Sequence, residues 1–116
     1  QLKGSISRRG KSSLDVESGA LGTYHSAISR AIEKAWQREA ISNRDYITPG
    51  VIRVRVVLDV DGEVRSVGTV DEFGIGAIQR GFTHRAIRQA ELPEMPAEVK
   101  KELDGEPLEL LYNFIF

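Results

Sequence analysis

Two short segments contain the residue types and spacings at which this sequence could carry chemistry. The first is GIGAIQRG, residues 74–81, in which Gly74 and Gly76 have the spacing of the first two glycines of a dinucleotide-binding loop. The third glycine position of that motif is occupied by Gln79, and the motif also requires a parallel βαβ unit. We therefore interpret these glycines as residues that ease a turn into a helix, with no nucleotide bound.

The second segment is DVDGE, which begins at Asp59 and resembles part of a calcium-binding loop. An EF-hand loop needs a third ligand before its glycine and a distant bidentate glutamate, and neither is present. The two histidines, His25 and His84, lie far apart in sequence on predicted helix surfaces, without a second metal ligand nearby. We expect a hairpin turn at DVDGE, and we expect no metal and no cofactor.

Composition narrows the class of protein further. The 116 residues suit one domain, and their 41% apolar and 28% charged content is ordinary for a globular fold. The net charge of −1 argues against a nucleic-acid-binding protein, which usually has a basic face. There are no cysteines and no nucleophile-elbow motif, so we expect no catalytic residues. A small hydrolase using His25 or His84 is the remote alternative.

The N-terminal residues 1–20 are rich in serine, glycine and charge and show no sustained period. We interpret them as a flexible linker remnant and residues 21–116 as the folded domain. No apolar run approaches the ~20 residues of a membrane span. Because the chain begins with Gln1 and not with methionine, we interpret it as part of a longer protein, and the sequence leaves open whether a membrane anchor or an export signal precedes it.

A helix is predicted where apolar residues recur at three- and four-residue spacing. We expect it to begin at Thr23 as N-cap, to run to about Glu39 and to be followed by a break at Pro49 and Gly50. Its single tryptophan, Trp36, should lie in the core. The residues of the apolar stripe are Tyr24, Ala27, Ile28, Ala31, Ile32, Ala35 and Trp36.

A β-hairpin is predicted next, because apolar and charged residues alternate over 52–60. Asp61 and Gly62 suit a type I′ turn, since both tolerate positive φ. The return strand should span about 63–70. Its valines depart from strict alternation, which predicts a bulge near Gly68.

A second helix is predicted at about 75–90, a helical turn at 97–103 and a last strand at 108–116. The order helix, strand, strand, helix, strand predicts an α+β fold built on a split β-α-β unit. Its three-stranded antiparallel sheet should have the order second, first, third. Both helices should cover one face, and the last strand should be an edge.

The assembled motifs resemble the C-terminal periplasmic domain of TonB and TolA proteins over residues 21–116. The resemblance rests on the tracts YHSAISRAIEKAW, GVIRVRVVLDVDGEVRSV, AIRQAELPEMP and LDGEPLELLYNFIF. Its most specific residues are the helix end, the hairpin glycine, the LPEMP step at 92–96 and a terminal Gly-x-x-Leu…Tyr-x-Phe pattern. By number these are Ile32, Trp36, Gly62, Gly105, Leu108, Tyr112 and Phe114.

The resemblance implies a non-catalytic domain of a periplasmic energy transducer that is anchored in the inner membrane. Such proteins contact inner-membrane motor proteins through their N-terminal part and couple proton-motive force to outer-membrane transport. TonB-like members bind a short receptor peptide, the TonB box, alongside the last strand, and TolA-like members also pair strands with partners. The long connection REAISNRDYITPG leaves the choice between the two subfamilies open.

The apolar last strand carries the functional prediction. Alternation places Leu108, Leu110, Tyr112, Phe114 and Phe116 on one face, toward the helices. As an edge without lysine, and with proline only at its start, the strand should accept a partner strand by β-augmentation. A homodimer paired at the same edge is the alternative. The residues predicted to contact the partner are Leu110, Leu111, Tyr112, Asn113, Phe114 and Ile115, helped by Val57.

Overall fold

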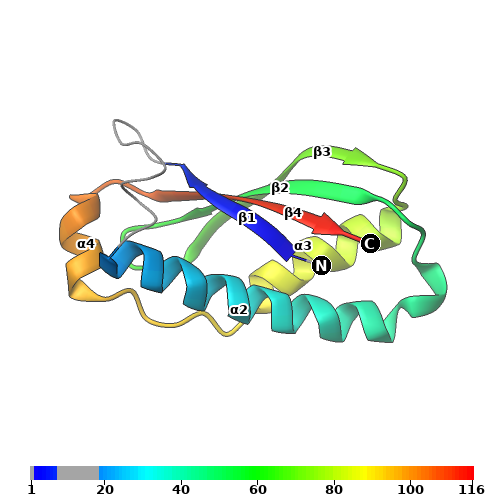
Figure 1. The fold of residues 1–116 in the computed structure, drawn as a ribbon, viewed down its shortest axis with the longest axis horizontal. Coiled ribbons are helices and arrows are strands. Elements are labelled where there is room, and N and C mark those ends of the chain that lie inside the picture. Colours follow the sequence, from blue (N-terminus) through cyan, green and yellow to red (C-terminus); the bar gives the residue numbers. More distant parts are fainter. Residues whose placement is uncertain (1, 8–18) are drawn as a thin grey trace.

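A four-stranded antiparallel sheet covered on one face by helices makes up the described part of the computed structural model, residues 2–7 and 19–116 (Figure 1). The sheet order is β1-β4-β2-β3. The elements are β1 (Leu2–Ser7), α2 (Gly19–Ser42), the 3₁₀ turn η1 (Arg44–Tyr46), β2 (Val51–Leu58), β3 (Val64–Phe73), α3 (Ala77–Gln89), α4 (Ala97–Leu103) and β4 (Leu108–Ile115).

The predicted α+β class and strand order are confirmed. The hairpin strands and the last strand lie in the order β3-β2-β4, with every neighbouring pair antiparallel. The predicted helical turn at 97–103 is α4. Helix α2 begins earlier than expected, and Thr23 is not its N-cap: the Thr23 hydroxyl donates to the carbonyl of Gly19, one turn back inside the helix.

The core forms between α2, α3 and the inner face of the sheet, as the apolar patterns predict. The Trp36 ring lies 5.1 Å from the Phe114 ring and 5.1 Å from the Phe116 ring, between centroids. The indole N–H of Trp36 donates to the Thr83 hydroxyl of α3 at 3.2 Å. Burying this one polar atom without a partner would cost stability, and the bond removes that cost while joining the two long helices.

The predicted type I′ turn is wrong. Within the loop between β2 and β3, Gly62 has a positive φ of 84° but Asp61 does not. One carboxylate oxygen of Asp59 instead accepts hydrogen bonds from the backbone N–H groups of Asp61 and Glu63. This side-chain cap closes a longer loop than a two-residue turn, which is a common use of aspartate in turns.

Strand β3 extends to Phe73, three residues beyond its expected end, and it carries two irregularities. Its pairing with β2 shifts register between Arg53 and Val54 and again between Val57 and Leu58. The extra residues on β3 are Val70 and Arg65, one on each side of Gly68. The bulge predicted near Gly68 is thus confirmed as a pair of bulges, which bend and twist this edge of the sheet.

The prediction that the last strand is an edge is wrong. Strand β1 pairs with β4 along its whole length, from Leu2 opposite Phe114 to Ser7 opposite Glu109. In Figure 1, β1 lies beside β4 on the side away from β2. Residues 2–7 were predicted as linker because segment 1–20 is rich in serine, glycine and charge and shows no sustained period, although Leu2, Gly4 and Ile6 alternate with polar residues over this short stretch. Gly19 and Ala20, also predicted as linker, belong to α2, and Gln1 and residues 8–18 lie outside the described residues.

Candidate functional site: the β4 edge

The direction of each backbone group along β4 follows from one hydrogen bond. The N–H of Phe116 donates to the carbonyl of Gly50 at 2.8 Å, and the β2–β4 register continues to place these residues opposite each other. Hydrogen-bonded and non-hydrogen-bonded pairs alternate in antiparallel sheets. The even-numbered residues of β4 therefore bond to β2, and the odd-numbered residues direct their N–H and C=O groups toward β1.

The six predicted contact residues accordingly fall into two groups. Leu110, Tyr112 and Phe114 are fully buried and belong to the core. Leu111, Asn113 and Ile115 are half-buried, lie on the sheet face without helices and present their backbone groups to the β1 side. A strand paired with β4 would thus contact the backbone of the second group, while the first group holds the edge in place.

Tyr112 connects this edge to α2 through Ser29, which the sequence did not single out, and through His25, which was predicted to lie on a helix surface. Its hydroxyl lies 3.0 Å from the Ser29 hydroxyl, and its ring lies 6.0 Å from the His25 ring, between centroids. Burial raises the pKa of Tyr112 to about 12, against a smaller lowering by the Ser29 hydrogen bond. His25 and Ser29 are four residues apart, on one face of α2, so both can contact the same residue of β4.

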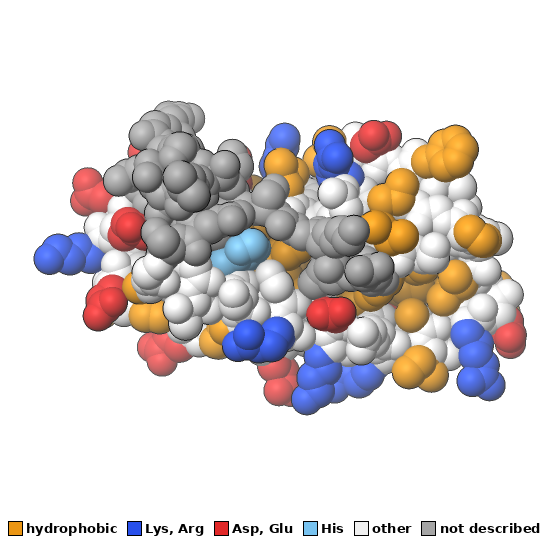
Figure 2. All heavy atoms as spheres, viewed as in Figure 1, with side chains coloured by type: hydrophobic (Ala, Val, Ile, Leu, Met, Phe, Trp, Pro, Cys, Tyr) orange, Lys and Arg blue, Asp and Glu red, His pale blue; other side chains and the backbone are white. Residues whose placement is uncertain are grey.

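The outer face of the sheet mixes apolar and charged residues. The Arg53 side chain donates to the Asn113 side-chain oxygen at 3.0 Å, across β2 and β4. Register aligns Phe73, Val51 and Ile115 in one row across three strands, and Phe73 is 80% exposed. Figure 2 shows apolar side chains gathered at the end of the molecule where β3 finishes and β2 begins.

The free energy of the backbone hydrogen bonds between β1 and β4 is close to the conformational entropy cost of ordering β1. Its hydrogen-bonded positions are Lys3, Ser5 and Ser7, opposite Asn113, Leu111 and Glu109. Three such pairs exchange about six hydrogen bonds, worth about 0.5–1.5 kcal/mol each, or about 3–9 kcal/mol together. Ordering six residues costs about 6–12 kcal/mol in backbone entropy. Side-chain burial therefore decides how firmly a strand is held at this edge.

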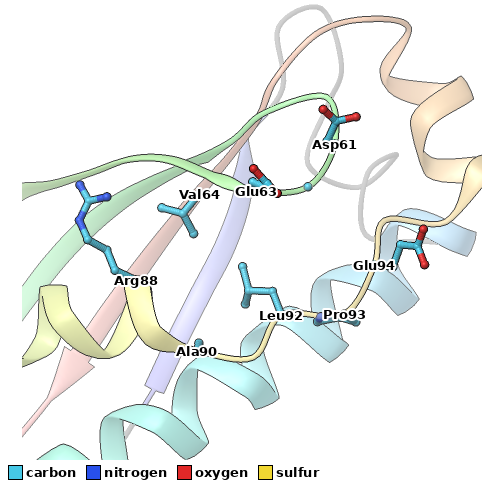
Figure 3. A pocket seen from close by; sticks show the side chains of 9 residues that line it. Asp61, Glu63, Val64, Arg88, Ala90, Leu92, Pro93 and Glu94 are labelled. Carbon is cyan, nitrogen blue, oxygen red and sulfur yellow. The ribbon is translucent and has the colours of Figure 1, made fainter.

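A groove of about 460 Å³ lies at the other end of the hairpin, between its turn and the connector after α3 (Figure 3). Asp61, Glu63 and Glu94 border it, and Leu92 points into it toward Val64. The structure thus brings the hairpin glycine, Gly62, next to the LPEMP segment, residues 92–96. The two meet by packing, since Met95 and Gly62 are buried against each other.

Tyr24 lies beneath this junction. Its hydroxyl is buried and has no hydrogen-bond partner among the described residues. Burial raises the pKa of Tyr24 to about 12, with a further contribution from the nearby charge of Asp59. A neutral phenol in this position acts as packing for the hairpin turn.

Polar contacts at the β3 edge of the sheet hold β3 onto α3. The Arg80 Nε–H is shared between the two oxygens of the Glu72 carboxylate, at 3.0 and 2.9 Å, and Arg80 Nη2 donates to Glu72 Oε1 at 2.5 Å. This pairing lowers the pKa of Glu72. His84 Nε2 lies 2.8 Å from the Thr69 hydroxyl. Burial lowers the pKa of His84, and so do the charges of Arg88 and Arg80.

Within the described ranges, 2–7 and 19–116, no cluster of three or more histidine, aspartate or glutamate side chains could hold a metal ion. None of the helices in the described chain has the length and apolar character needed to cross a membrane. No protein-family model matches the sequence, and a comparison with curated proteins finds no match.

Proposed function

We propose that this protein is a non-catalytic interaction domain that receives an extended segment of a partner protein as an added strand at β4. The resemblance to TonB and TolA C-terminal domains supports an outer-membrane receptor or another envelope protein as the partner. On this proposal the full-length protein is periplasmic and anchored in the inner membrane. It contacts the motor proteins through its N-terminal part and transmits proton-motive force to outer-membrane transport.

One observation carries the proposal: the β4 edge takes a strand from a distant segment of the chain, in unbroken register. From Leu2 to Ser7, each residue of β1 has a single partner in β4. The β3 edge differs, because its two bulges at Arg65 and Val70 are a usual protection against strand addition. Of the two strands that pair with β2, β4 is therefore the one suited to receive another strand on its far side.

Because β1 lies at this edge, a partner strand has to take its place. The balance between hydrogen bonding and chain entropy makes such a replacement feasible, provided that the incoming strand buries more side-chain area than LKGSIS does. A partner with larger residues at alternate positions fits this requirement. The exchange leaves the rest of the sheet unchanged, since only the β1–β4 ladder is broken.

A second copy of the chain is the alternative partner. The observation that favours it is that β1 is the N-terminal strand of the sheet and packs mainly on β4. Exchange of β1 between copies costs little stability, because an identical strand replaces the one that leaves. Sedimentation over a range of concentrations separates the two ideas, because a stable dimer at micromolar protein would favour exchange between copies.

The test is a peptide array that covers the N-terminal segments of outer-membrane receptors from the source organism. We expect a peptide to bind and to shift the backbone amide signals of Glu109, Leu111 and Asn113. Leu111→Pro should abolish this binding, because it removes a backbone N–H directed to the edge. The control Val70→Pro changes a bulged residue on the other edge and should leave binding intact. Binding that survives Leu111→Pro in a folded protein would refute strand addition at β4.

A further inference from the structure

The β1–β4 ladder also defines the geometry of the strand that this edge receives. We infer that the partner strand runs antiparallel to β4 in the register of β1 and that it competes with residues 2–7 for the site. This inference rests on the proposed function. It adds the orientation and register of the partner, its residue preferences and its competitor.

The register specifies which partner residues supply hydrogen bonds. Lys3, Ser5 and Ser7 occupy the hydrogen-bonded positions opposite β4 residues 113, 111 and 109. A partner residue in any of these three positions must keep its N–H. Proline there would break the ladder, whereas proline at the two intervening positions would remove only an outward-directed N–H.

Gly4 is the position of β1 at which a partner strand could pair more strongly with β4 than β1 does. It lies opposite Tyr112, in the middle of the β4 edge. Glycine is among the weakest residues in strands, because it loses the most entropy and supplies no side chain for cross-strand contact. Tyr112 is also the residue that α2 holds through Ser29 and that packs near His25. A β-branched or aromatic residue opposite Tyr112 should therefore distinguish a partner from β1.

Competition with β1 lowers the apparent affinity of such a partner for β4. A strand tethered in the same chain acts at a high effective concentration, so a free peptide with the sequence of β1 should bind weakly. Binding becomes measurable when the peptide pairs with β4 more strongly than β1 does, or when the pairing of β1 is weakened. A suitable probe is the acetylated and amidated peptide LKVSIS, which is the β1 sequence with valine in place of glycine.

The first experiment measures binding of this probe to two variants of the 116-residue chain. Ser5→Pro removes the N–H that faces Leu111, and it should strengthen probe binding by roughly tenfold or more relative to the unmodified chain. Gly4→Pro is the matched control: the proline lies one residue away, but the N–H that it removes points away from β4, so its affinity should stay close to that of the unmodified chain. Equal affinity for all three proteins would refute the competition.

The second experiment locks β1 in place. The chain has no cysteines, so Ser5→Cys combined with Leu111→Cys introduces one defined pair at directly opposed positions. Opposed residues of an antiparallel pair lie within disulfide reach. The oxidised protein should lose probe binding, and reduction should restore it. This comparison uses one folded protein in two redox states, and probe binding that is the same in both states would refute the inference.

The third measurement is orientation. A spin label at the probe's N-terminus should broaden the amide signals of Phe114 and Ile115, and a label at its C-terminus should broaden that of Glu109. The reverse pattern would show a parallel strand and overturn the assigned register. Binding of a receptor peptide without any advantage in Ser5→Pro would refute this inference and the replacement of β1, and it would leave intact the proposal that the protein is an interaction domain for receptor peptides. Ser5→Pro protein that stays folded and binds neither the probe nor any receptor peptide would refute both.

Discussion

The hydroxyl groups of Ser29 and Tyr112 lie 3.0 Å apart and join α2 to the middle of β4. The two residues are 83 positions apart in sequence. This bond fixes the height of the β4 edge above the helix at the position where β1 contributes Gly4. The receiving edge is thus supported from below by a helix and not by the strand alone.

Removing the two hydroxyls separately should have unequal effects. Tyr112→Phe removes the buried hydroxyl and should lower the free energy of unfolding by about 0.5–1.5 kcal/mol. Ser29→Ala leaves the Tyr112 hydroxyl buried without its partner and should cost more, about 1–3 kcal/mol. Urea denaturation of both variants measures the difference. A smaller loss in Ser29→Ala than in Tyr112→Phe would show that water satisfies the tyrosine.

The two buried tyrosines predict alkaline unfolding. Burial raises the pKa values of Tyr24 and Tyr112 from 10.0 to about 12, so the folded state keeps both phenols neutral while the unfolded chain ionises. The unfolded state then binds fewer protons, and stability falls as pH rises from 10 toward 12. Denaturation midpoints followed across this range, with phenolate absorbance, should show the loss. Tyr112→Phe should show a smaller loss, and an unchanged slope would contradict the assignment.

His84 predicts a loss of stability in mild acid. Burial and the charges of Arg88 and Arg80 lower its pKa below the ordinary 6.5. On acidification the unfolded chain therefore takes up the proton first, so the contribution of neutral His84 is complete above pH 6.5 and falls as pH drops toward the folded pKa. Unfolding measured between pH 7 and 5 should show this decrease, and His84→Gln should reduce it. An NMR titration that gives His84 a raised pKa would refute the prediction.

Two glycines provide a matched test of the hairpin. Gly62 has a φ of 84°, and a Cβ there would lie 2.9 Å from the Tyr24 hydroxyl and 3.1 Å from the Met95 side chain. Gly62→Ala should therefore destabilise the fold by more than about 1 kcal/mol. A Cβ at Gly68 would have no neighbour within 4 Å, and its φ is not positive. Gly68→Ala should be neutral or stabilising, and equal effects in thermal unfolding would refute this reasoning.

Local periods in the sequence were enough to predict the helical stripe, the hairpin strands and the buried row of the last strand, and the order of these elements along the chain predicted the order of the strands in the sheet. Apolar residues recur at three- and four-residue spacing in α2, and they alternate with other residues in β2 and β4. Leu110, Tyr112 and Phe114 were assigned to the core for this reason, and they are buried there. Burial of apolar side chains has a periodic signature that can be recognised in sequence.

The tertiary structure alone, in contrast, identified residues 2–7 as the strand that pairs with β4. The pairing of residues 2–7 with residues 109–114 is made by backbone groups, which every non-proline residue carries. The alternation in LKGSIS is short and has only two large apolar residues, Leu2 and Ile6, so it does not identify the pairing. The cap on the hairpin loop by Asp59 and the contact between Ser29 and Tyr112 were hidden for a related reason. Each depends on where a single polar group lies in three dimensions, and a single polar residue has no period.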